Sequence, residues 1–436
     1  MDDRPFCFSK SVTLLQFFLP LKCYSLPFTK THDQSMIQKN TYTFIVATLS
    51  LVAIFAISSA PVPMLGLFQQ TFHMTGADLA MTAVCYFLGC IPALLFCSRL
   101  PNRLGRKPVV ALALTIGAIS SLAVIFATSP LHIMLARVGQ GFACGLASGS
   151  AMAWIFDSAP AHNRSISAML AASGPGIGFL FGALAAAIAY ELFAISYQHI
   201  FTGLFVGLVT VLVLSLFGKE TVTHPSGTLW QTLTPKLEIP QRLKKKYLLA
   251  VAAYAGTWGV GGFFQAYSAQ IASDALHSAN MLTAAFVFLS FIGTNALGSF
   301  CIKRLQPKEA LNSFIFLFGC CVCLMFFFLH NENFVLFFIF CVFSGISVGA
   351  SCSAALRIVT QNAQSQERTG LLAAVYLAAY LGPGLPNLII GQLKLPVTID
   401  GMSWFYGAWA IVFTVIVLIG SRLVLTPAVS HEEHIR

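Results

Sequence analysis

The sequence predicts an all-α membrane protein in which twelve transmembrane helices form two six-helix, pseudo-symmetric halves. Composition is the first reason, because 57% of the 436 residues are hydrophobic and only 9% are charged, too few to cover a soluble surface. Apolar runs of about twenty residues, long enough to span a bilayer, recur along the chain. Short Gly-Pro motifs repeat about two hundred residues apart, which indicates an internal duplication.

The twelve spans are the apolar runs that lie between Pro, Gly and charged residues. In the first half they occupy residues 43–65, 78–98, 108–128, 131–156, 165–190 and 200–218. In the second half they occupy residues 246–271, 281–301, 310–330, 334–356, 369–393 and 403–424. The chain therefore divides into a leader, a first half, a linker, a second half and a tail, at residues 1–38, 39–218, 219–245, 246–425 and 426–436.

The leader is not expected to cross the membrane. Its mildly apolar stretch, residues 11–28, is interrupted by Pro20, Lys22 and Pro27, and broken helices are tolerated in lipid only where other protein covers them. No small-residue cleavage pattern of a signal peptide is present. Two alternatives stay open: a cytoplasmic tail, or translation that begins at Met36.

Charge predicts the orientation of the bundle. Of the 25 Lys and Arg residues, all but Arg137 and Lys394 fall on the side that carries both termini, and cytoplasmic loops retain such residues. Both termini are therefore predicted to be cytoplasmic. The net charge of +10 reports this topology and does not indicate nucleic-acid binding.

Cysteine usage predicts neither disulfides nor a metal site. The twelve cysteines lie in helices and the leader, and none lies in a predicted outer loop. Cys320, Cys321 and Cys323 cluster inside an apolar helix without nearby His or carboxylate, as expected of small core side chains.

A basic hairpin, residues 98–107, separates the second span from the third. Gly105 permits a tight turn at the membrane surface, and Arg103, Arg106 and Lys107 are placed to meet lipid phosphates and carboxylates. Asp157 ends the fourth span on the same side of the membrane.

The fourth span holds a charge well inside a membrane helix. Arg137 there would cost about 2.5–3.5 kcal/mol on insertion scales, so it must face protein or water. Gln140 follows on the same helix face, and Gly141 and Gly145 form a small-residue seam for close packing. Either proton coupling or contact with a substrate anion, or a structural bond to carbonyls of a neighbouring helix, would explain Arg137.

These motifs resemble the major facilitator superfamily. The spacing Ser98-x-x-x-Asn102-Arg103-x-Gly105-Arg106-Lys107 is similar to its hairpin signature, and Arg137-x-x-Gln140-Gly141-x-x-x-Gly145 to its fourth-helix motif. The resemblance implies that Asp157 pairs with a hairpin arginine to latch an outward-facing state. Two positions depart from the signature, since Ser98 replaces Gly and Asn102 replaces an Asp that meets the start of the eleventh helix, so the latch is expected to be weaker.

The fifth span resembles the drug:proton antiporter-like branch of that superfamily. Gly174, Pro175 and Gly178 partly match the branch's fifth-helix motif, and the later Gly382-Pro383-Gly384 repeats the pattern. A phosphate-binding loop is excluded because neither the lysine nor the preceding strand is present. The resemblance also implies a bacterial-type inner membrane as the location.

Substrate sites in such folds lie near the bilayer midplane between the halves. Polar and aromatic residues of the seventh, eighth and eleventh spans are the candidates for lining that site, although packing would explain each one: Tyr254, Trp258, Gln265, Tyr267, Asn295, Tyr376, Tyr380 and Asn387.

The resemblance implies a secondary active transporter that works by alternating access. The first six spans carry no Asp or Glu near the midplane, so proton-coupled efflux of a neutral or amphipathic compound is favoured over export of a cation. Uptake of a nutrient such as an amino acid or sugar by proton symport is the alternative, and a non-transporting sensor is a third. We expect a monomer in the lipid bilayer with a small-molecule substrate and protons as partners, and no enzyme activity, cofactor, metal or nucleic acid.

Overall fold

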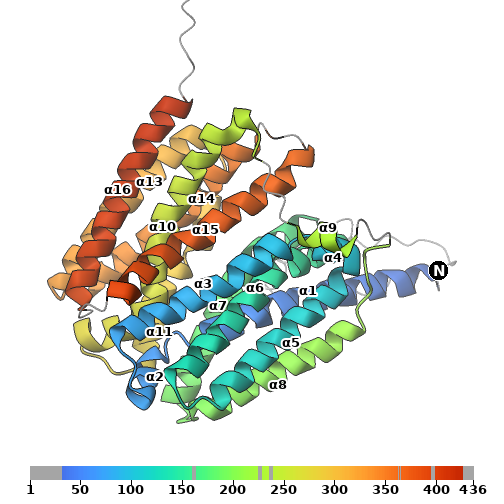
Figure 1. The fold of residues 1–436 in the computed structure, drawn as a ribbon, viewed down its shortest axis with the longest axis horizontal. Coiled ribbons are helices and arrows are strands. Elements are labelled where there is room, and N and C mark those ends of the chain that lie inside the picture. Colours follow the sequence, from blue (N-terminus) through green and yellow to red (C-terminus); the bar gives the residue numbers. More distant parts are fainter. Residues whose placement is uncertain are drawn as a thin grey trace, which may run out of the picture. The chain divides into compact units, whose positions relative to one another are not determined.

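The computed structural model describes residues 32–159, 164–223, 228–234, 239–361, 363, 365–393 and 398–425 (Figure 1). Every regular element within these residues is a helix. The described residues fall into two units, one that ends at Gln38 and one that begins at Lys39. Most of the predicted leader, the N-terminal 31 residues, and the predicted tail lie outside the described residues.

The helices of the first half follow the predicted order. They are α1 (His32–Ser59), α2 (Leu65–Phe72), α3 (Gly76–Phe96), α4 (Leu100–Leu104), α5 (Arg106–Ile125), α6 (Pro130–Ser158), α7 (Arg164–Glu191) and α8 (Tyr197–Leu216). The linker contains two short elements, α9 (Leu229–Leu233) and η2 (Gln241–Leu243). The second half contains α10 (Lys244–Gln270), the π-helical turn η3 (Ile271–Ala275), α11 (Met281–Ile292), α12 (Asn295–Cys301), α13 (Pro307–His330), α14 (Phe334–Thr360), α15 (Ser365–Leu393) and α16 (Ile399–Leu425).

The predicted all-α, multi-pass fold is confirmed. Eleven stretches of the described residues are long and apolar enough to cross a membrane, and they correspond to eleven of the twelve predicted spans. The fourth span is the exception, because α6 carries Arg137, Asp157 and many Gly and Ser residues that lower its hydropathy. With 29 residues it is nevertheless among the longest helices, and it packs against α3 and α5.

Two predicted spans end or break differently in the structure. The first was predicted to reach residue 65, but α1 ends at Ser59 because Pro61 and Pro63 lack the N–H groups that a helix needs. The eighth span is two helices, α11 and α12. The Thr294 hydroxyl at the break donates to the carbonyls of Ser290 and Phe291 at 2.9 and 3.1 Å, which competes with backbone pairing.

Glycines bring α3 and α6 into direct backbone contact. A Cβ atom at Gly141 would overlap the carbonyl oxygen of Tyr86, and one at Gly145 would lie 2.8 Å from the carbonyl oxygen of Cys90. The predicted small-residue seam therefore faces α3. Inside a membrane there is no hydrophobic driving force between helices, so the van der Waals packing that this close approach allows stabilises the pair.

The second half repeats this seam between α14 and the α11–α12 pair. A Cβ atom at Gly345 would overlap the carbonyl oxygen of Phe291, and one at Gly349 that of Asn295. The two contacted carbonyls are four residues apart in each half, as are the two glycines. The same packing device thus recurs in both halves, as an internal duplication predicts.

The two halves meet away from the basic hairpin. We call the end of the bundle that carries residues 98–107 the hairpin end and the opposite end the far end. At the far end a Cβ atom at Gly391 of α15 would lie 2.9 Å from the sulfur of Met81 of α3. There the backbone N–H of Met281, which begins α11, also donates to Glu191, which ends α7. Figure 1 shows α15 running beside α3, the pair of helices that brings Gly391 to Met81.

Candidate functional site

The basic hairpin is closed by a network of charged side chains. Arg106 donates from Nε to Oδ2 of Asp157 at 3.2 Å and from a terminal nitrogen to Oδ1 of Asn102 at 2.8 Å. Gly105 has a φ angle of 101°, a conformation that residues with a Cβ rarely adopt. Arg103 is exposed at the tip of the hairpin. The predicted pairing of Asp157 with a hairpin arginine therefore involves Arg106.

Glu220 is a functional candidate that sequence reasoning missed. Its carboxylate accepts the backbone N–H groups of Arg106 and Lys107 at 2.9 and 3.0 Å, so it caps the N-terminus of α5, where a negative charge is favourable. The Lys107 ammonium donates in return to the Leu216 carbonyl at 2.6 Å, near the C-terminus of α8. A Cβ atom at Gly105 would overlap the Glu220 carboxylate. This lack of space is a second reason, besides the positive φ angle, why position 105 requires glycine.

Among the described residues, the partners in this network belong to the first half or to the first residues of the linker. Thr221 also donates to Asp157 at 3.2 Å, and the Trp154 indole donates to the Lys219 carbonyl at 3.0 Å. The Arg106–Asp157 pair forms while the halves touch at the far end, so its described contacts join α5 and α6 and not the two halves. The side chains at the start of α15, which Asn102 is predicted to meet, lie outside the described residues.

We expect Glu220→Ala to destabilise the hairpin more than Asp157→Asn does. Glu220 satisfies several backbone amides, and loss of such a cap costs about 1–2 kcal/mol. The Arg106–Asp157 pair is partly exposed and is worth about 0.5 kcal/mol. Thermal unfolding of the purified variants measures both effects, and Glu309→Ala, a carboxylate in the first turn of α13, is the matched control. Equal losses in the first two variants would contradict the capping role.

Arg137 is fully enclosed between α1 and α3. Its guanidinium donates to the carbonyl of Ser58 and to Oε1 of Gln140, the latter at 2.9 Å, and it lies 4.8 Å from the ring centre of Tyr86. Arg137 is 2% exposed and is not among the residues that line the central cavity described below. Tyr86 lies between the charge and that cavity.

The Ser58 carbonyl needs a partner because α1 ends there. In a continuous helix it would accept the N–H of Val62, but Val62 donates to the Ser59 carbonyl instead, at 3.0 Å. Arg137 therefore binds a carbonyl at a helix C-terminus, where a positive charge is favoured. A contact of this kind is what the structural interpretation of Arg137 expects, in which the side chain binds a carbonyl of a neighbouring helix. The Nε2 atom of Gln140 is buried and has no hydrogen-bond partner among the described residues.

The glycine-proline motif of α7 has two faces. Gly174 and Gly178 pack on α1, because Cβ atoms there would each lie 2.5 Å from side-chain carbons, of Leu51 and Phe55 respectively. Pro175 and Gly176 line the central cavity. Pro383 of α15, the counterpart of Pro175, lines the same cavity from the second half.

A cavity of about 480 Å³ lies between the two halves, lined by helices of both. Six of the eight predicted residues line it: Tyr254, Trp258, Gln265, Asn295, Tyr376 and Tyr380. Ser98, at the start of the hairpin, and Ser299, near the end of α12, line it as well, so the cavity extends toward the hairpin end.

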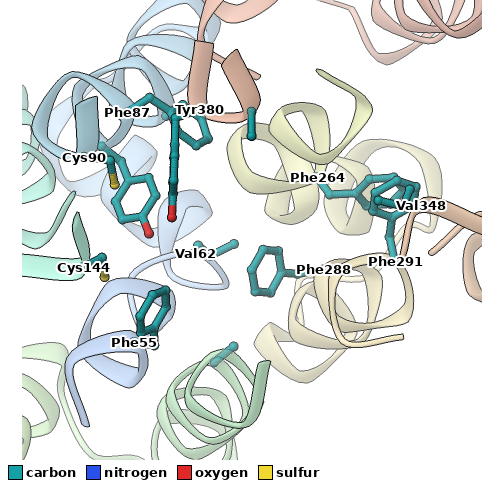
Figure 2. Close-up of a cluster of buried hydrophobic side chains, with 14 of the residues drawn as sticks. Phe55, Val62, Phe87, Cys90, Cys144, Phe264, Phe288, Phe291, Val348 and Tyr380 are labelled. Carbon is teal, nitrogen blue, oxygen red and sulfur yellow. The ribbon is translucent and has the colours of Figure 1, made fainter. Parts of the chain in front are cut away.

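Aromatic rings from both halves form one connected group in the wall. Trp258 contacts Tyr254 and Tyr380 with ring centres 5.8 and 5.5 Å apart, and Tyr380 contacts Phe87 of α3 at 6.3 Å. Figure 2 shows Phe87 beside Tyr380, with Phe55 and Phe288 around the same region. These phenylalanines could not be found from the sequence. In a membrane helix, a Phe that faces a cavity and a Phe that faces lipid both lie in apolar sequence.

Tyr267 and Asn387 do not line this cavity, which corrects the prediction for both. Asn387 is buried in helix packing, where its Nδ2 donates to the Pro383 carbonyl and its Oδ1 accepts from the Tyr406 hydroxyl, both at 3.0 Å. Tyr267 is fully buried against Phe263, with ring centres 5.7 Å apart. Asn387 thereby joins α15 to α16, whereas the ring contact of Tyr267 lies within α10.

The described lining of the cavity carries no Asp, Glu, Lys, Arg or His. Its polar side-chain groups are amides, hydroxyls, the indole N–H of Trp258 and a thiol. With its amide oriented to satisfy hydrogen bonding, Asn295 donates from its nitrogen to the Gly345 and Phe291 carbonyls at 2.9 Å. The cavity can therefore offer ring faces and neutral hydrogen-bonding groups, which suit an uncharged or amphipathic small molecule.

These features define a class: a polytopic helical membrane protein with two repeated halves around a central cavity. The family model described as Major Facilitator Superfamily matches residues 46–387, and the chain belongs to this superfamily. The predicted resemblance is therefore confirmed.

Three relatives are similar to parts of the chain. An uncharacterized transporter of Rickettsia bellii is 31% identical over 34% of this chain and 36% of its own length, and one of Rickettsia felis is 26% identical over 58% and 64%. The multidrug resistance protein MdtL of Klebsiella pneumoniae is 26% identical over 48% and 52%. The chain thus spans less than two thirds of the length of these relatives.

Two solved structures share the fold. A bacterial homologue of the human lysosomal transporter Spinster, in an inward-facing and unoccupied conformation, has a TM-score of 0.65 at 15% identity, covering 89% of this chain and 99% of its own. The nucleoside transporter NupG, solved as a point mutant, has a TM-score of 0.66 at 14% identity, covering 87% and 99%. At these identities the likeness concerns the fold alone.

Proposed function

We propose that this protein is a secondary active transporter that moves a neutral or amphipathic aromatic compound across a bacterial-type inner membrane by alternating access. The observation that carries the proposal is the uncharged, aromatic cavity shared by the two halves. The position of the cavity between the halves supports alternating access, because rocking of one half against the other would open the site to either side in turn.

Efflux driven by protons is the proposed direction and coupling. The similarity to a relative named as a multidrug resistance protein supports efflux, and the partial motif in α7 supports the antiporter-like branch. Because the described cavity lining holds no carboxylate, the proton would be carried by a group outside that lining. Proton-coupled nutrient uptake is the alternative. The protein is proposed to act as a monomer, with both termini cytoplasmic.

Ligand binding should quench the fluorescence of Trp258, which lines the cavity. We expect saturable quenching by neutral aromatic compounds in the purified full-length protein, and none by small inorganic cations. Trp258→Phe should remove the ligand-dependent signal while the other four tryptophans still fluoresce. Equal quenching in that variant would contradict binding in this cavity.

Flux in vesicles then separates the proposed directions. With a proton gradient imposed across proteoliposomes, antiport and symport move the bound compound in opposite directions, and each changes the internal pH. Movement with the proton flow would support the uptake alternative. Binding without flux in either direction would favour a sensor and would contradict transport.

A further inference from the structure

The far end contains a charged contact between the two halves. Glu191 is the last residue of α7 and Met281 is the first residue of α11, and the Met281 N–H donates to Oε1 of Glu191 at 2.5 Å. Glu191 is half-buried and Met281 is 6% exposed. Other carboxylates of the described residues form their contacts within one half or with the linker beside it, as Asp157 and Glu332 do.

Glu191 completes the N-terminal cap of a helix that belongs to the opposite half. Asn280, the residue before α11, accepts the N–H of Leu282 through its own side chain. The N–H of Met281 has no partner within its helix, since the first amides of any helix lack one. Glu191 supplies that partner and places a negative charge at the positive end of α11. A charge-assisted hydrogen bond of this kind is about twice as strong as a neutral one.

The surrounding contacts are apolar and carry no comparable directional bond among the described residues. Gly391 of α15 packs on Met81 of α3, and Gly66 of α2 packs on Ala269 of α10. These contacts close the far end by shape, while the cavity extends toward the hairpin end. Opening the far end would separate α7 from α11 and break the hydrogen bond between the Met281 N–H and the Glu191 carboxylate.

We propose that Glu191 is the far-end gate residue, which stabilises the conformation in which the halves meet at the far end by capping α11 across the interface. This inference rests on the proposed alternating access. Glu191 does not line the cavity. It would affect the conformational equilibrium through its hydrogen bond to α11 and not through contact with a substrate. A substitution shifts the equilibrium between the closed and the open far end only if it changes the free energies of the two conformations by different amounts. The capping bond exists only in the closed conformation, so its loss would favour the open one.

Distances between spin labels measure the two conformations directly. One label pair at the exposed positions Thr71 and Asn331 reports on the far end, and a second pair at Leu104 and Arg304 reports on the hairpin end. Both pairs are introduced as cysteines in the full-length protein, with the exposed native cysteines replaced by serine, and measured in lipid nanodiscs without substrate. Glu332→Gln is the matched control, because Glu332 is an exposed carboxylate that contacts His277 within the second half.

Glu191→Ala is expected to raise the population with a separated far end about tenfold, with a matching approach of the hairpin-end labels. Glu191→Gln keeps an acceptor oxygen but loses the charge, so a smaller shift in the same direction is expected. Glu332→Gln should leave both distance distributions unchanged. If Glu191→Ala does not accumulate, the Gln variant decides the matter. Wild-type distributions in every Glu191 variant that folds would overturn the gate, and so would an equal shift in Glu332→Gln.

The transport assay is independent of this readout. A protein that shows the expected shift but moves no compound in vesicles would overturn the proposed transport and leave the gate in place. A protein that transports but shows no shift would overturn the gate alone.

Discussion

Replacement of Gly141 by valine is expected to reduce the amount of protein in the membrane to less than about a tenth of the wild-type level. A Cβ atom at this position would overlap the Tyr86 carbonyl oxygen, and the obstacle is backbone, which cannot move aside as a flexible side chain can. The helices α3 and α6 would have to separate along their contact. Overpacking of this severity exceeds about 4 kcal/mol, which few single substitutions reach.

A matched substitution shows whether the position or the residue type is responsible. Gly203 of α8 is exposed, and a Cβ atom there would meet nothing within 4 Å, so Gly203→Val should accumulate normally. Gly349→Val, at the equivalent seam of the second half, should fail as Gly141→Val does. Membrane abundance of a fluorescent fusion, followed by size-exclusion chromatography in detergent, measures all three. Normal accumulation of Gly141→Val would contradict the backbone contact between α3 and α6.

Loss of the Arg137 side chain is expected to destabilise the protein by about 2–4 kcal/mol. Arg137→Ala leaves the Ser58 carbonyl at the end of α1 without its donor, and it also removes the contact with the Tyr86 ring. Arg137→Lys keeps the charge but cannot reach both acceptors as a planar fork does, so an intermediate loss is expected. Thermal unfolding in detergent measures stability, and flux per folded molecule measures transport.

The same pair of measurements distinguishes the two alternatives for Arg137. A structural role predicts that flux per folded molecule survives in Arg137→Lys, whereas a coupling role predicts normal stability with lost proton-driven flux. Arg357→Ala is the control, since Arg357 of α14 also donates to a backbone carbonyl, that of Ile302 at 3.1 Å, but from a less buried position. A fully stable and fully active Arg137→Ala would contradict both roles.

Signals that depend on length, charge and local spacing were sufficient to predict the architecture of this chain. The length of apolar runs predicts the spans, because the thickness of a bilayer sets a minimum length for a helix that crosses it. The position of Gly141 and Gly145 four residues apart predicts a seam, and the structure shows which backbone it meets. The basic hairpin was likewise found from sequence, since Arg106 and Asp157 lie at the ends of predicted helices on one side.

The partners of these residues could not be predicted from sequence. Glu220 caps α5 from 114 residues away, and no local pattern connects a carboxylate in a linker with amides of a distant helix. Tyr267 and Asn387 were expected in the cavity because they are polar residues in membrane helices, as are Gln265 and Asn295, which do line it. Only the packing of the helices against one another determines that Gln265 and Asn295 line the cavity whereas Tyr267 and Asn387 do not.

Residue order was thus enough to predict a two-halved helical bundle of the membrane, with a basic hairpin and a buried arginine in its first half. Which side chains face the cavity, which face lipid and where the halves touch became known only from the folded chain. The bilayer explains this division. In water, polar and apolar faces of a helix differ in composition, but in a membrane the lipid-facing, packed and aromatic cavity-facing residues are all apolar, so periodicity does not distinguish them.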